Sequence, residues 1–197
     1  MSDHAASTRR RFVLAGAVSA GLGFVPGRAL AELSPTPACH DGDEATLRQT
    51  EGPFFKSRSP QRADLIEPGM RGRPLALSGT VLTRACRPLE RVLVDLWHAD
   101  DTGEYDNTGF RLRGHVFTDA QGRYAFRTIV PAAYEGRTRH FHVKVAAPGR
   151  PVLTTQFYFP DEPKNRRDPL FRRELLLRVA EAGDGVDARF DVVLDMR

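Results

Sequence analysis

Residues 139–145 read RHFHVKV and alternate strictly between polar and apolar side chains. This alternation is typical of a β-strand with one buried face, because successive side chains of a strand point to opposite faces. The apolar residues then face a core, while His140 and His142 share the other face. Side chains two apart on a strand lie about 7 Å apart along it, which lets two imidazoles lean toward one metal ion. The alternative is a half-buried strand whose outward face merely carries histidine, and the rest of the chain must decide between them.

The rest of the sequence predicts more strands and almost no helix. A chain of 197 residues, with 41% hydrophobic and 27% charged residues, fits one soluble globular domain. Apolar runs separated by turn residues predict strands over 75–83, 91–98, 110–118, 123–129, 139–146, 153–159, 173–180 and 188–195. Strands this numerous without helices between them predict an all-β fold, an antiparallel β-sandwich of about eight strands.

A less regular segment precedes the predicted sandwich. Residues 32–72 are rich in Pro, Gly and charge without sustained periodicity, and we predict an extended N-terminal arm with one short helix near 44–49. The sandwich domain is then residues 73–197. Two long loops, 98–107 and 131–139, interrupt it, and binding residues concentrate on such loops.

The first 31 residues have the features of an export signal. Paired arginines precede the weakly apolar run VLAGAVSAGLGFV, and Ala29-Leu30-Ala31 follows as a cleavage pattern. We predict a twin-arginine signal peptide over 1–31 and a periplasmic or extracellular bacterial protein. An ordinary secretory signal and a membrane anchor are the alternatives, but the run is short for a membrane span, so no stable membrane insertion is expected.

Removing this segment changes the charge and the cysteine context. Residues 1–31 contain four arginines and one aspartate, net +3, so the formal charge falls from +4 to +1. With no basic run interleaved with aromatics, nucleic-acid binding is not expected. Cys39 and Cys86 are the two cysteines, and in an oxidising compartment their simplest arrangement is one disulfide, the alternative being two buried thiols.

Each of the two long loops contains one tyrosine, Tyr105 in the first and Tyr134 in the second. Two phenolates and the two neutral imidazoles of His140 and His142 form a plausible ligand set for a hard trivalent ion. A highly charged cation can deprotonate a phenol at neutral pH, and two tyrosinates with one hydroxide neutralise Fe(III). Zinc and copper favour His and Cys sets, and non-haem Fe(II) favours two histidines with a carboxylate.

Five segments together resemble the intradiol ring-cleavage dioxygenases. They are QTEGPFF at 49–55, VDLWHADDTGEYD at 94–106, YAFRTIVPAAY at 124–134, RTRHFHVKV at 137–145 and LTTQFYF at 153–159. The resemblance implies a β-sandwich holding one Fe(III), with Tyr105 and Tyr134 as tyrosinate ligands and His140 and His142 as histidine ligands. It places Arg137 beside the substrate and Gln156 as a polar residue just outside the ligand set.

The reaction implied by this resemblance is cleavage of a catechol by O2 between its two hydroxyl-bearing carbons, giving a cis,cis-muconate-type product. The iron acts as Lewis acid and template, and no organic cofactor is needed. Tyr134 is the ligand released when the substrate chelates, and Arg137 stabilises developing negative charge. The rival hypothesis is an exported transthyretin-like or carbohydrate-binding sandwich without catalysis. The identity of the catechol and the oligomeric state stay open.

Other polar or aromatic residues have simpler interpretations. His98 is expected to pack or hydrogen-bond at the base of its loop and is a weak candidate for a fifth ligand. His115 is expected to be structural, and Tyr124 and Tyr158, which lie inside strand patterns, are expected to pack.

Overall fold

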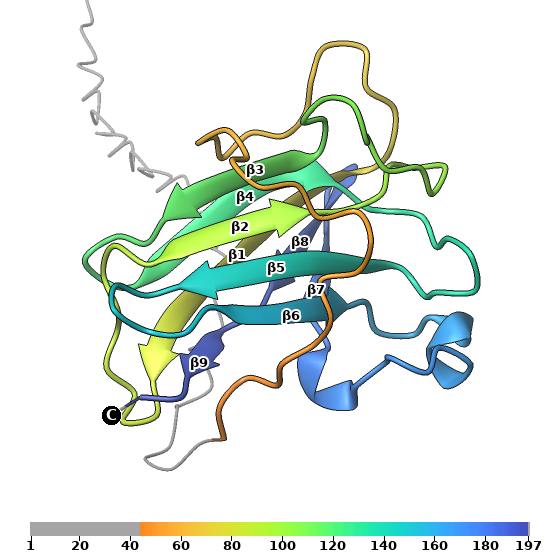
Figure 1. Cartoon of the computed structure of the whole chain (residues 1–197). Coiled ribbons are helices and arrows are strands. Elements are labelled where there is room, and N and C mark those ends of the chain that lie inside the picture. Colours follow the sequence, from red (N-terminus) through yellow and green to blue (C-terminus); the bar gives the residue numbers. More distant parts are fainter. Residues whose placement is uncertain (1–43, 197) are drawn as a thin grey trace, which may run out of the picture. The chain divides into compact units, whose positions relative to one another are not determined.

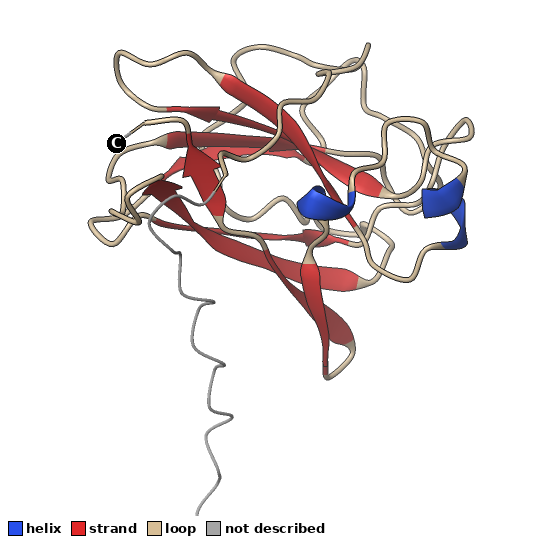
Figure 2. Ribbon diagram, turned by 90° about the horizontal axis from the view of Figure 1, so that it is seen from below, coloured by secondary structure: helices blue, strands red, loops and turns tan. Residues whose placement is uncertain are grey.

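Two β-sheets lie face to face in the computed structural model, which describes residues 44–196 (Figure 1). The strands are β1 Pro74–Thr83, β2 Leu93–Trp97, β3 Arg113–Phe117, β4 Arg123–Ile129, β5 His140–Ala146, β6 Leu153–Tyr158, β7 Arg178–Ala182, β8 Gly185–Arg189 and β9 Val192–Leu194. One sheet has the order β4-β1-β8-β7, with β9 also paired to β1, and the other has the order β3-β2-β5-β6. Figure 2 shows the two layers with two short 3-10 helices beside them, η1 Pro163–Arg166 and η2 Arg173–Leu175. The predicted β-sandwich is confirmed.

The first six predicted strands are confirmed, and the last two need correction. The predicted strand 173–180 begins as helix η2, and only its end belongs to β7. The predicted strand 188–195 is divided between β8 and β9, and both pair with β1 in parallel rather than antiparallel. The division has a physical cause: the Asp191 side chain, not a backbone carbonyl, accepts the hydrogen bond of Thr80 N at 2.8 Å.

The core lies between the sheets and contains one face of β5. Phe141, Val143 and Val145 are fully buried there, as the alternation of RHFHVKV predicts. Gly79 on β1 allows β1 to pass close to the chain after β8, because a Cβ at this position would lie 1.8 Å from the carbonyl oxygen of Phe190. With the inward face of β5 buried in the core, His140 and His142 lie on the outer face of the four-stranded sheet.

The segment before β1 covers that outer face. Residues 44–60, orange in Figure 1, run across β6, β5 and β2 toward β3 without forming a helix. The short helix predicted near 44–49 is therefore wrong. Its amides bond to other segments instead: Thr46 N donates to Val193 O at 2.9 Å, and Gln49 N donates to Thr154 O at 2.8 Å. An isolated bridge between Gln61 and His115 continues the contact to β3.

Some predictions concern residues that the structure does not describe. The export signal at 1–31 and Cys39 both lie outside residues 44–196, so the signal and the disulfide remain predictions. Within 44–196, no helix has the length and apolar character needed to cross a membrane.

Candidate metal centre

Strand β5 brings its two histidines together beneath the covering segment. His140 is 2% exposed and His142 is 1% exposed, and their Nε2 atoms lie 3.1 Å apart. His140 Nδ1 donates to the carbonyl oxygen of Thr138 at 2.6 Å, which leaves the lone pair on its Nε2. Two ring nitrogens that converge in this way can share a proton or bind one cation.

Burial keeps both imidazoles neutral. It lowers the pKa of His140 to about 4 and holds that of His142 well below its ordinary value, with the nearby Arg137 charge adding to both effects. Neutral imidazole is the form that binds a metal ion. The pair is therefore in its metal-binding form at neutral pH.

Tyr105 and Tyr134 complete the cluster. Their ring centroids lie 5.2 Å from each other, Tyr105 is 6.1 Å from His142, and Tyr134 is 5.9 Å from His140. The Tyr105 hydroxyl and His142 Nδ1 are buried without a hydrogen-bond partner. Burial raises the pKa of both phenols, so neither ionises at neutral pH unless a cation stabilises the phenolate. We call Tyr105, Tyr134, His140 and His142 the His/Tyr cluster.

The donor set of this cluster fits a hard cation. In the described part of the chain no group of three or more His, Cys, Asp and Glu side chains is arranged to hold a metal ion. The oxygen donors beside the imidazoles are phenols, which favour Fe(III) when ionised. The converging Nε2 atoms and the unpartnered Tyr105 hydroxyl are the features that a bound ion would satisfy.

A buried arginine holds the loop that carries Tyr105 through hydrogen bonds to its backbone. Arg113, 2% exposed, donates to Asp106 O at 3.1 and 3.0 Å and to Phe54 O at 2.7 Å. These bonds tie the Tyr105 loop to the covering segment. Phe54 also stacks on the Tyr105 ring, with 4.4 Å between centroids.

The loop that carries Tyr134 makes a tight turn at its end. Arg137 N donates to Tyr134 O at 2.6 Å, and Glu135 and Gly136 between them have positive φ values of 39° and 81°. This left-handed backbone suits Gly136 well. The turn therefore brings Arg137 next to Tyr134.

Arg137 and Gln156 are in direct contact beside the cluster. Arg137 Nη2 donates to Gln156 Oε1 at 2.6 Å, and Gln156 Nε2 donates to Thr50 O at 2.9 Å. Gln156 is fully buried and is the cross-strand partner of His142. The structure therefore brings together all six residues singled out from the sequence: Tyr105, Tyr134, Arg137, His140, His142 and Gln156.

Three neighbours of the cluster were not predicted. Trp97 stacks on His142, with 5.0 Å between ring centroids, and Asp168 pairs with Arg137. The Tyr158 hydroxyl donates to Gln156 Oε1 at 2.9 Å, so Tyr158 does more than pack. Its position two residues after Gln156 on one strand was an available signal, because such residues share a face.

The simpler interpretations of three other residues agree with the contacts observed. His98 Nδ1 donates to Ala99 O and its Nε2 accepts from the Thr128 hydroxyl, both at 2.7 Å, so it is not free to be a fifth ligand. His115 Nδ1 contacts the Ser59 hydroxyl at 3.1 Å. Tyr124 is buried in the core and donates to Phe190 O at 2.7 Å.

A cavity of 280 Å³ opens over the two tyrosines, and Phe54, Asn107 and Glu135 also contribute to its wall. This volume is close to the lower end of ordinary ligand pockets. Tyr105 and Tyr134 are its only members of the His/Tyr cluster, and His140, His142 and Arg137 do not line it. A larger cavity of 490 Å³ borders Val130 and contains none of the His/Tyr cluster. Its arginines are paired with carboxylates, Arg73 with Glu181 and Arg139 with Glu162. The smaller cavity is therefore the one that reaches the cluster, through its two tyrosines.

A β-sandwich with two histidines and two tyrosines meeting on its outer face is the arrangement expected of intradiol dioxygenases, and comparison with known proteins agrees. Residues 50–196 match the Dioxygenase_C family, described as dioxygenase. A catechol 1,2-dioxygenase of Acinetobacter lwoffii is 32% identical over 174 residues, covering 75% of this chain and 63% of that protein. A hydroxyquinol 1,2-dioxygenase of Nocardioides simplex is 29% identical over 196 residues, covering 86% of this chain and 64% of that protein.

Solved structures give the same result. The dioxygenase domain of a dioxygenase carbohydrate-binding protein fusion from Streptomyces sp. SirexAA-E is 55% identical with a TM-score of 0.77, covering 78% of this chain and 100% of that one. The 3-chlorocatechol 1,2-dioxygenase of Rhodococcus opacus 1CP is 29% identical with a TM-score of 0.69, and the match covers 79% of this chain and 73% of that one. The chain belongs to the intradiol ring-cleavage dioxygenase family. It spans somewhat under two thirds of the length of the two curated relatives named above.

Proposed function

We propose that this protein is a non-haem Fe(III) dioxygenase that cleaves a catechol-type ring between its two hydroxyl-bearing carbons. The observation that carries the proposal is the approach of His140 Nε2 and His142 Nε2 to 3.1 Å beside the rings of Tyr105 and Tyr134. Family membership supports the reaction class. In the balanced reaction, catechol and O2 combine, the carbon–carbon bond between the hydroxyl-bearing carbons breaks, and both oxygen atoms enter a cis,cis-muconate-type dicarboxylic acid.

Tyr105, Tyr134, His140 and His142 would hold the ion. When bound, Fe(III) supplies Lewis acidity and a template on which the substrate's two oxygens are oriented. Two tyrosinates and one hydroxide would balance its charge, which suits a site where both histidines are almost fully buried. No organic cofactor is required.

The protein's own groups handle protons and charge. Tyr134 is only half-buried and lies on a turn. We assign to its phenolate oxygen, the form it would take as a ligand, the role of accepting a proton from an incoming catechol hydroxyl. Tyr105 is more deeply buried and stays in place. Arg137 supplies a fixed positive charge for negative charge developing on the substrate, while Gln156 holds one of its amino groups.

Activity assays test this proposal. Purified protein is offered O2 with catechol, hydroxyquinol and protocatechuate, and ring opening is followed by oxygen uptake and product absorbance. We expect one oxygen molecule consumed per catechol-type ring opened. Iron-loaded protein that opens none of them would favour the rival hypothesis of a non-catalytic binding sandwich.

Two proposals concern the segment outside the described residues. We propose export by the twin-arginine route to the periplasm or beyond, supported by the pattern over 1–31, and one disulfide between Cys39 and Cys86. Twin-arginine export transports folded proteins, which suits one that acquires iron before export. Non-reducing peptide mapping of exported protein tests the disulfide, and two free thiols contradict it.

The proposed partners are a catechol-type small molecule and O2, without nucleic acid or stable membrane insertion.

A further inference from the structure

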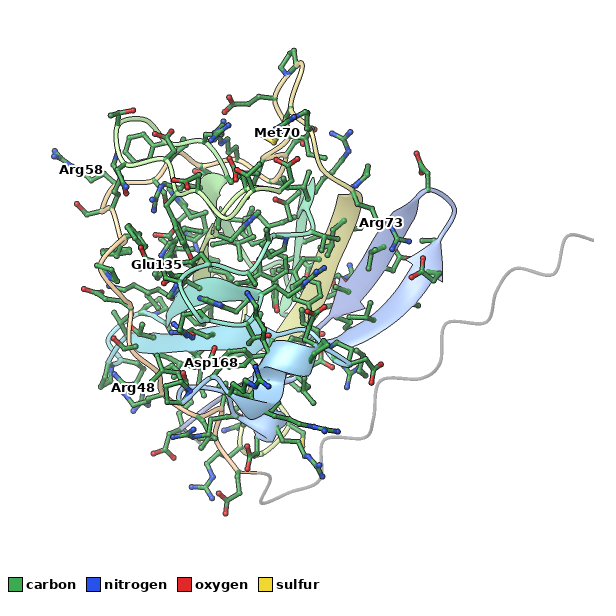
Figure 3. The ribbon with its side chains drawn as sticks, turned by 90° about the vertical axis from the view of Figure 1, so that its right-hand side faces the viewer. Arg48, Arg58, Met70, Arg73, Glu135 and Asp168 are labelled. Carbon is green, nitrogen blue, oxygen red and sulfur yellow. The ribbon has the colours of Figure 1, made fainter. Side chains whose placement is uncertain are left out.

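A fully buried carboxylate stands behind Arg137. The side chain of Asp168 is 0% exposed. The residue comes shortly after helix η1, on the blue segment beside the four-stranded sheet. Figure 3 labels Asp168, and it also labels Glu135 on the Tyr134 turn. Taking a carboxylate out of water costs several kcal/mol unless it is paired and hydrogen-bonded. Asp168 has such partners, and they lead to the His/Tyr cluster.

The first partner is the guanidinium of Arg137. Arg137 Nε donates to both oxygens of Asp168, at 3.0 and 2.9 Å, while Nη2 donates to Gln156 Oε1 at 2.6 Å. These contacts hold the planar group along one edge and at one amino group. The Arg137 side chain is 14% exposed, so few other orientations are open to it.

The second partner is the backbone leading to His140. Asp168 Oδ2 accepts from Thr138 N at 3.0 Å, and Thr138 O in turn accepts from His140 Nδ1 at 2.6 Å. Asp168 Oδ1 also accepts from Leu170 N at 2.9 Å, which fixes the carboxylate on its own loop. One buried carboxylate therefore anchors the short segment from which both Arg137 and His140 project.

A second ion pair, between Arg139 and Glu162, lies near Arg137 and Asp168 in the sequence but does not reach the His/Tyr cluster. Arg139 Nε and Glu162 Oε1 lie 2.9 Å apart, and their side chains are 35% and 20% exposed. Within residues 44–196, no hydrogen bond joins Arg139 or Glu162 to Gln156 or to the His/Tyr cluster. The pair joins the same two segments as Arg137 and Asp168, so it provides a matched control.

We propose that Asp168 is the positioning residue for Arg137 in ring cleavage. The proposal rests on the proposed function and extends it to a residue on a separate loop. A guanidinium held in place before the reaction stabilises developing charge without reorganising, and a small displacement of such a group can lower the rate about 10²-fold. Asp168 thus acts on the reaction through Arg137 rather than by touching the substrate.

A double-mutant cycle tests the proposal. The variants are Asp168→Asn, Arg137→Ala, the combination of both, and Glu162→Gln as control. We expect Asp168→Asn to lower kcat by roughly 10- to 100-fold with little change in KM, and Glu162→Gln to stay within about 2-fold of the parent. In the Arg137→Ala background, Asp168→Asn should change kcat by less than about 2-fold, because residues that act as a unit are not additive. Asp168→Glu, which keeps the charge but moves the carboxylate, replaces Asp168→Asn if that variant does not fold.

A second readout does not depend on activity. In isotope-labelled full-length protein stripped of metal, the Arg137 Nε–H resonance should be visible and slowly exchanging, and Arg137→Lys assigns it. We expect this signal to vanish or exchange at least about 10-fold faster in Asp168→Asn, because the Arg137 Nε–H loses a hydrogen bond to an Asp168 oxygen. We expect it to be unchanged in Glu162→Gln.

The two readouts separate the possible failures. If the parent protein opens no catechol ring, the proposed function fails, and the resonance alone decides whether Asp168 fixes the guanidinium. If the parent is active and Asp168→Asn is as active as Glu162→Gln, or if it lowers kcat equally with and without Arg137, the positioning role is overturned. An Arg137 signal that is unchanged in Asp168→Asn overturns it as well.

Discussion

The indole of Trp97 lies parallel to the imidazole of His142, with 5.0 Å between ring centroids and 9° between planes. The two residues are direct partners in the pairing of β2 with β5, so the sheet itself brings the rings together. Trp97 is 1% exposed. The stack restricts the orientation of the His142 ring, much as outer contacts orient metal ligands in other proteins.

We expect Trp97→Leu to weaken metal retention about 10- to 100-fold and to lower the free energy of unfolding by about 3 kcal/mol. The first effect follows from a looser His142 ring, the second from the lost buried area. Chelator competition and urea unfolding measure the two separately. Phe126→Leu, in the other sheet, is the control, because it also replaces a buried aromatic ring with a smaller aliphatic side chain. Equal metal retention in the two variants would contradict the role given to Trp97.

Tyr134→Phe should keep iron but slow the binding of catechol. Tyr105, His140 and His142 remain as ligands, while the phenol oxygen that accepts a substrate proton is lost. Stopped-flow mixing with catechol, with iron content measured on the same sample, checks the prediction. Tyr124→Phe removes a buried hydroxyl in the core and serves as the control. Parental binding and turnover in Tyr134→Phe would mean that Tyr134 is not the exchanging ligand.

Arg137→Ala should keep iron and colour yet lower kcat by roughly 10²- to 10³-fold, the loss typical of a removed electrostatic stabiliser. The reason is that the charge acts on the reacting substrate and not on the ion's ligands. Steady-state kinetics and a visible spectrum measure the two properties. Arg139→Ala, which disrupts the ion pair with Glu162, is expected to leave both near parental values. Loss of iron from Arg137→Ala would instead point to a structural role.

His98 predicts a pH dependence of stability that is separate from the metal ligands. Burial lowers the pKa of His98 to about 4, although its hydrogen bond to Ala99 O opposes the shift. The unfolded chain binds a proton near pH 6.5 and the folded chain does not, so stability present above pH 6.5 is lost as the pH falls toward 4.

Between pH 7 and pH 5, this single group should lower the free energy of unfolding of metal-free protein by about 2 kcal/mol. Urea unfolding at the two pH values measures it, with His98→Gln as the comparison because an amide can replace both hydrogen bonds but does not titrate. We expect a smaller loss in His98→Gln, and an equal loss in both proteins would show that His98 does not titrate as described.

Local patterns were enough to predict much of this fold. The alternation in RHFHVKV predicts which face of β5 is buried, and Phe141 and Val143 are buried as expected. Two loop tyrosines next to a His-x-His strand identify the candidate ligands, because the ligand chemistry depends on residue type more than on exact position. The single strand predicted over 188–195 was wrong for a different reason. There the side chain of Asp191 accepts the hydrogen bond of Thr80 N in place of a backbone carbonyl, and a run of apolar residues does not show this.

The parts that sequence reasoning missed depend on contacts between distant segments. Trp97 meets His142 through strand register, which a single sequence does not specify. Asp168 reaches Arg137 from a loop 31 residues further along the chain, and no local pattern marks it. The helix expected near 44–49 is absent because Thr46 and Gln49 use their amides on other segments, a tertiary effect that overrides local propensity.

The most direct test of the central claim is metal analysis with a visible spectrum on purified protein and on His142→Ala. If Tyr105, Tyr134, His140 and His142 hold Fe(III), the parent contains about one iron per chain and is coloured by charge transfer from tyrosinate to iron, while His142→Ala loses most of both. A parent protein that stays colourless and metal-free after reconstitution with iron would contradict the account.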